Sequence, residues 1–132
     1  MNSGTGTRPG SDFTVEPREG YLYLHLAPAF EMTPESMAAS WVALSEACRR
    51  YGQRRVLVEG DNVRRRLTTI ETFDHAGLAA KLMPGLSVAC VFRGFVPDQQ
   101  TQFFRTAAMN RGVRTEFFDD LNEALKWLGV AT

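Results

Sequence analysis

Apolar residues recur along the chain with two spacings, and these separate predicted strands from predicted helices. In residues 20–26, leucines alternate with larger amphipathic residues, among them Tyr21 and Tyr23. This alternation is typical of a strand with one buried face and one partly wet face. Residues 12–17 form an earlier β-prone run, and the turn at 18–20 predicts that the two strands form an antiparallel hairpin.

Four later stretches carry apolar residues at steps of three and four, which is the helical spacing. The first begins at Thr33 and Pro34, a capping residue followed by the proline that suits a first turn, and ends at Gly52. The second begins at Thr68 with a capping-box pattern and stops before Pro84. The other two helices are predicted at about residues 98–111 and 120–128.

Short apolar runs near residues 56–58, 87–92 and 113–118 stand between these helices. A run without alternation is typical of a strand covered on both faces. The predicted order is therefore ββαβαβαβα, an α/β fold with a mostly parallel sheet of about five strands. We expect one domain over residues 12–132, and a flexible leader at 1–11 that is rich in turn-forming residues.

The composition is that of an ordinary globular domain. The 132 residues are 44% hydrophobic and 23% charged, and no apolar run is long enough to span a bilayer. Fifteen basic residues balance fifteen acidic ones, so no net field attracts nucleic acid or an anionic membrane. Cys48 and Cys90 lie among apolar neighbours, which favours buried thiols in a reducing cytosol over a zinc or disulfide site. We therefore expect a cytoplasmic protein without a cofactor.

Five stretches of the chain have the pattern of a known family. They are GYLYLHL at 20–26, the helix with Trp41 and Ala47-Cys48, RRVLVEGD at 54–61, LSVACVF at 86–92, and NRGVRTEFFDDLNEALKWL at 110–128. Together they resemble the STAS-like domains, named for sulfate transporters and anti-sigma factor antagonists, and in particular the single-domain bacterial members. The resemblance covers about residues 12–129. It implies a STAS-like fold and a non-enzymatic regulatory module that binds a protein, or in some relatives a nucleotide or an apolar molecule.

Thr68 and Thr69 are the candidate switch or ligand site. Family members that act as anti-sigma antagonists carry a phosphorylatable serine in a DSSG-like run at the start of the helix after the third strand. This chain has RLTTIE at residues 66–71 and lacks that serine. A helix start beside the arginines at 64–66 would stabilise a phosphate group. An ordinary N-cap explains the same two threonines.

Glu59 and Asp61 are candidates for an acid/base pair or a magnesium site. They follow a buried strand, and open α/β sheets bind ligands at the carboxyl ends of their strands. No third partner is evident, and local hydrogen bonding explains the pair as well. His25 and His75 stand in no recognisable nucleophile motif. A small enzyme using Glu59 and Asp61 is therefore the less favoured alternative, and we expect no catalytic residue.

Tyr21, Tyr23, Phe30 and Met32 are the candidate partner surface. The tyrosines lie on the amphipathic side of their strand, where packing against helices would also explain them. Phe30 and Met32 lie in a predicted loop between strand and helix, where apolar residues have fewer structural reasons to occur. The predicted partner is a protein or an apolar small molecule. An exposed edge strand could also pair with a second copy and give a homodimer.

Overall fold

The computed structural model describes residues 12–130, so the predicted leader at 1–11 lies outside the described residues. The elements in chain order are β1 (Phe13–Arg18), β2 (Tyr21–Leu26), β3 (Glu31–Met32), α1 (Pro34–Tyr51), β4 (Arg55–Asp61), β5 (Arg64–Arg65), α2 (Thr69–Leu82), β6 (Ser87–Arg93), α3 (Gln99–Asn110), β7 (Arg114–Phe118) and α4 (Leu121–Leu128). The main sheet has the order β1-β2-β4-β6-β7. β1 is antiparallel to β2, and the other neighbours are parallel. The predicted α/β class, opening hairpin and mostly parallel sheet are confirmed.

The predicted element order is incomplete, because two short strands interrupt it. β3 and β5 form a separate two-stranded parallel sheet, in which Glu31 pairs with Arg64 and Met32 with Arg65. The observed order is therefore βββαββαβαβα. A two-residue strand shows no periodicity, and its partner lies far away along the chain. The pair ties the segment before α1 to the segment before α2.

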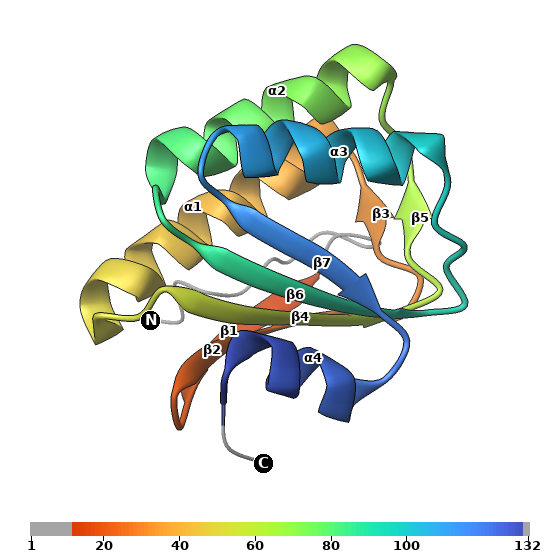
Figure 1. Ribbon diagram of the computed structural model, residues 1–132. Coiled ribbons are helices and arrows are strands. Elements are labelled where there is room, and N and C mark those ends of the chain that lie inside the picture. The colour runs from red at the N-terminus through yellow and green to blue at the C-terminus, as the bar shows by residue number, and fades with distance from the viewer. Residues whose placement is uncertain (1–11, 131–132) are drawn as a thin grey trace.

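Helices cover both faces of the main sheet. Figure 1 shows α1, α2 and α3 on one side of it and α4 on the other. Along β4, Val56 and Val58 belong to the core beneath the three helices, whereas Leu57 packs in the smaller cluster beneath α4. Because both faces of this central strand are covered, its sequence does not alternate.

The helix boundaries follow the predicted capping signals. The Thr33 side chain accepts a hydrogen bond from the backbone N–H of Ser36, and Gly52, with φ 61°, is the C-cap that follows α1. α4 begins after its N-cap Asp120 and is followed by its C-cap Gly129, with φ 79°. Both glycines adopt the left-handed conformation, which a residue with a Cβ enters only at a cost.

α2 is the helix most distant from the sheet. It packs against α1 and α3, and within residues 12–130 it makes no close backbone contact with a strand. Its buried residues are Thr72, His75, Ala76 and Ala79. Alanine and threonine side chains reach less far than leucine or phenylalanine would. α2 therefore leaves part of the space above the sheet unfilled.

Gly60 and Gly77 provide a matched test of this packing. A Cβ at Gly60 would lie 2.8 Å from Val63 Cγ1 and 3.2 Å from Leu26 Cβ, so Gly60→Ala should destabilise the fold by about 1–3 kcal/mol through overpacking. A Cβ at Gly77 meets nothing within 4 Å, so alanine there should stabilise α2 by about 0.5–1 kcal/mol. Urea unfolding measures both changes. Free energies of unfolding that shift in the same direction would contradict this description.

Candidate functional site

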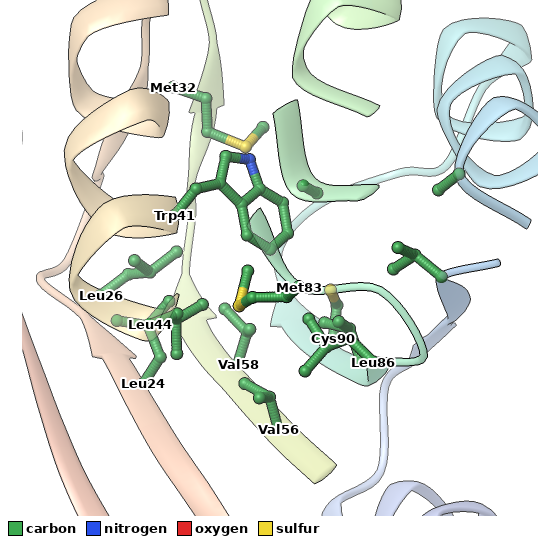
Figure 2. Close-up of a cluster of buried hydrophobic side chains, with 14 of the residues drawn as sticks. Leu24, Leu26, Met32, Trp41, Leu44, Val56, Val58, Met83, Leu86 and Cys90 are labelled. Carbon is green, nitrogen blue, oxygen red and sulfur yellow. The ribbon is translucent and has the colours of Figure 1, made fainter. Parts of the chain in front are cut away.

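An apolar cavity of about 80 Å³ lies between the main sheet and the three helices on its first face. Its principal lining residues are Leu24, Val58, Val88 and Cys90 from the sheet, Trp41 and Leu44 from α1, Thr72 and His75 from α2, and Phe104 from α3. Figure 2 shows Trp41 and Leu44 with Val58 and Cys90 in this part of the core. For comparison, an engineered cavity of about 150 Å³ in another protein holds benzene. The present cavity has room for a smaller molecule.

The mouth of the cavity lies at the carboxyl end of the sheet. The lining residues there are only partly buried, and they include Arg65, Leu67, Phe95 and Gln100. These residues come from β5, from the segment before α2, from the segment before α3 and from α3 itself. Open α/β sheets bind their ligands at this end. The cavity therefore opens where the fold class places a ligand.

Hydrogen bonds join the two segments that border the mouth. Arg65 donates to both carboxylate oxygens of Asp98 and thereby holds the pKa of that carboxyl well below its usual range. Gln100 Nε2 donates to Leu67 O at 3.1 Å and to Thr72 Oγ1 at 2.9 Å. The start of α3 is thus tied both to β5 and to the start of α2. These bonds join the segments that contribute the partly buried lining residues.

Two buried polar atoms of the lining residues have no hydrogen-bond partner. Trp41 and His75 are each 5% exposed, and Trp41 Nε1 and His75 Nδ1 are both unpartnered in the described structure. Burial lowers the pKa of His75 below 6.5, although Asp74 and Glu71 oppose the shift, so the imidazole is neutral at neutral pH. Buried polar groups in folded proteins are nearly always hydrogen-bonded. Two exceptions among the lining residues of one cavity mark it as a candidate site.

Glu59 and Asp61 lie on the opposite face of the sheet, in a polar cluster with Arg93. Arg93 donates to Glu59 Oε2 at 2.5 Å and to Asp61 Oδ1 at 3.2 Å, and Tyr23 Oη donates to Glu59 Oε1 at 2.5 Å. The sequence placed Tyr23 in a different candidate site, and the sheet brings it to the carboxylates. Within residues 12–130, no three His, Cys, Asp or Glu side chains gather to hold a metal ion. Arg93 is therefore the shared partner of the two candidate carboxylates.

The protonation states of Tyr23 and Glu59 follow from their shared hydrogen bond. Burial raises the pKa of Tyr23, and the hydrogen bond to Glu59 raises it further. Burial alone would raise the pKa of Glu59, but the hydrogen bonds from Tyr23 and Arg93 outweigh it and lower this pKa below 4.5. At neutral pH the phenol is protonated and the carboxylate is ionised. Neither group is near the midpoint of titration that suits a general acid or base.

The four residues predicted as a partner surface separate into two places. Phe30 is 0% exposed and Met32 8% exposed, so both belong to the core and not to an exposed loop. The chain turns before them at Ala29, which has φ 58°, and β3 then pairs with β5. Met32 also lines the cavity. Tyr21 and Tyr23 are half-buried beside the cluster beneath α4.

Thr68 and Thr69 lie at the exposed start of α2. Thr68 Oγ1 accepts from the backbone N–H of Glu71 at 3.1 Å, and Glu71 Oε1 accepts from the backbone N–H of Thr68 at 2.8 Å, which completes the predicted capping box. Two of the arginines expected to assist a phosphate are near carboxylates instead, Arg65 bonded to Asp98 and Arg66 4.0 Å from Glu31. The Thr68 side chain therefore has a structural role that Thr69 lacks.

Comparison with known families and curated proteins identified no relative of this chain. No family model matches the chain, and no curated protein is similar to it. Among the described residues, no helix is long and apolar enough to cross a membrane. The fold and its cavity are therefore the basis for the functional assignment.

The capping role of Thr68 predicts an asymmetric effect of two neighbouring substitutions. Thr68→Ala removes the oxygen that accepts from Glu71 and should lower the free energy of unfolding by about 1 kcal/mol. Thr69→Ala, at the first residue of the same helix, should change it by less than about 0.5 kcal/mol. Thermal unfolding of both variants measures the difference. Equal losses would show that Thr68 is not the cap on which α2 depends.

His75 predicts a loss of stability on mild acidification. The pKa of His75 is lowered in the folded protein, so the unfolded chain binds a proton at this residue more readily. The stability that the neutral imidazole contributes to the fold is therefore fully present above about pH 6.5. It is lost as the pH falls through the folded-state pKa. In His75→Leu, the free energy of unfolding should fall less between about pH 7.5 and about pH 5 than it does in the wild-type protein. His25→Leu, at an exposed position of β2, is the matched control and should keep the decline. An unchanged decline in His75→Leu would contradict burial of a neutral imidazole.

Proposed function

We propose that this chain is a non-enzymatic binding module whose cavity takes up a small, largely apolar molecule. The cavity is the observation that carries the proposal: about 80 Å³ of space, lined mainly by apolar side chains, at the carboxyl end of the sheet. Protein interiors are normally packed as densely as organic crystals, and cavities in them reduce stability. Ligand pockets are mostly apolar with a few polar groups, and this lining has that composition.

The titratable groups near the cavity support binding over covalent chemistry. Burial raises the pKa of Cys90 to about 12, so its thiol stays protonated and unreactive at neutral pH. Glu59 and Asp61, which the enzyme alternative would use, lie on the other face of the sheet in ion pairs with Arg93. A catalytic pair would need two groups within reach of one bound substrate. The enzyme alternative therefore has less support.

The resemblance to STAS-like domains is consistent with this proposal, since it implies a non-enzymatic module that binds a protein, a nucleotide or an apolar molecule. In a regulatory module of that kind, a protein partner would bind outside the cavity. Tyr21 and Tyr23 remain our candidate contacts for it, because both are partly exposed. Cys48 and Cys90 are free thiols, which suits a reducing cytoplasm.

A titration with propane tests uptake into the cavity. This apolar molecule has half as many carbon atoms as benzene, which suits a space of about 80 Å³, about half the volume of the cavity that holds benzene. Two-dimensional amide NMR spectra should show saturable shift changes at residues of the lining, such as Val58 and Cys90. A wild-type protein that shows no saturable change would refute the proposal.

Two leucine substitutions separate uptake from nonspecific binding. Cys90→Leu places a larger side chain in the cavity and should weaken propane binding at least about ten-fold. Cys48→Leu makes the same change on α1, outside the lining of this cavity, and should leave the affinity within about two-fold of wild type. Circular dichroism establishes that both variants are folded. Equal weakening by the two substitutions would place the binding site elsewhere.

A further inference from the structure

The indole N–H of Trp41 is the strongest indication of what the cavity binds. Trp41 projects from α1 into the core, and Figure 2 shows its nitrogen on the edge nearest Met32. The residue is 5% exposed, and Nε1 donates to no acceptor in the described structure. An indole nitrogen only donates hydrogen bonds, and a methionine sulfur is a weak acceptor. The donor therefore lacks the oxygen or nitrogen that a buried N–H normally finds.

The rest of the cavity lining provides no free positive charge that would balance an anion. His75 on α2 is neutral at neutral pH, because burial lowers its pKa. Arg65 is the one charged residue in the described lining, and its guanidinium donates to both carboxylate oxygens of Asp98 and to Thr101 Oγ1. A carboxylate taken into this space would be buried without a free cation, which is strongly unfavourable. The interior therefore selects against charged ligands.

From these contacts we infer that the ligand is a small neutral compound with a carbonyl or hydroxyl oxygen that accepts a hydrogen bond from Trp41 Nε1. Its carbon skeleton packs against the apolar lining beside the indole, which includes Met32. The inference rests on the proposed function and names the ligand class of the same cavity. Small ketones, aldehydes, alcohols and amides belong to this class, and hydrocarbons and carboxylates do not.

Acetone and propane form a matched pair that isolates the hydrogen bond, because the carbonyl group of acetone replaces the central CH₂ group of propane. In wild-type protein, acetone should shift the indole N–H resonance of Trp41, and propane should not. Trp41→Phe removes the donor and keeps an aromatic ring. It should weaken acetone binding relative to propane by about five- to ten-fold, the effect of one neutral hydrogen bond. Trp127→Phe, in the cluster beneath α4, is the control and should leave the ratio unchanged.

The outcomes distinguish a failure of this inference from a failure of the proposed function. If both compounds bind and Trp41→Phe leaves their affinity ratio unchanged, the hydrogen bond to Trp41 is refuted and uptake into the cavity stands. If propane produces no saturable change in the wild-type protein, the proposed function fails. Acetate at neutral pH should bind at least about ten-fold more weakly than acetone. Equal or tighter binding of the carboxylate would overturn the neutral ligand class. Should Trp41→Phe not fold, the indole resonance of the wild-type protein decides the question.

Discussion

The packing of α2 determines how completely the space between the helices and the main sheet is filled. This helix rests on α1 and α3, and it points alanine, threonine and histidine toward the core. A cavity in a core costs about 24 cal/mol per Å³, so 80 Å³ corresponds to about 2 kcal/mol. The total stability of a domain is about 5–15 kcal/mol, so this cost is substantial. The proposed binding function would account for the absence of leucine at these positions of α2.

The two faces of the sheet carry different kinds of side chain at its carboxyl end. One face contributes Val58 and Cys90 to the cavity, and the other carries the polar cluster of Tyr23, Glu59 and Arg93. β4 contributes to both faces, so the two regions share one central strand. The polar cluster is satisfied within itself, whereas the lining residues of the cavity include two unpartnered atoms. This difference identifies the interior, and not the acidic pair, as the candidate site.

Local signals in the sequence predicted the parts of the fold that depend on local contacts. The alternation in β2 and the caps at Thr33 and Thr68 involve residues a few positions apart, and the structure has them as predicted. The burial of Phe30 depends on the pairing of β3 with β5 and on a positive φ at Ala29, which no periodicity reveals. The bond from Tyr23 to Glu59 depends on the register of β2 against β4.

The cavity could not be predicted, because it depends on the distance between helices and sheet and not on any one segment. The nearest signal in the sequence is the accumulation of small residues in α2, from Ala76 to Ala80, next to a lone histidine. Such a helix is also compatible with close packing on a sheet. The unpartnered indole of Trp41 could not be predicted either, because the sequence shows Trp41 only as one residue of the helix predicted between Thr33 and Gly52.

A crystal structure determined under xenon pressure tests the central claim most directly. Xenon binds in apolar cavities and needs no chemical complementarity. The account predicts xenon density between α2 and the sheet, in contact with Val58 and Cys90, with the surrounding backbone unchanged. A structure in which side chains fill that space, and no xenon binds there, would contradict it.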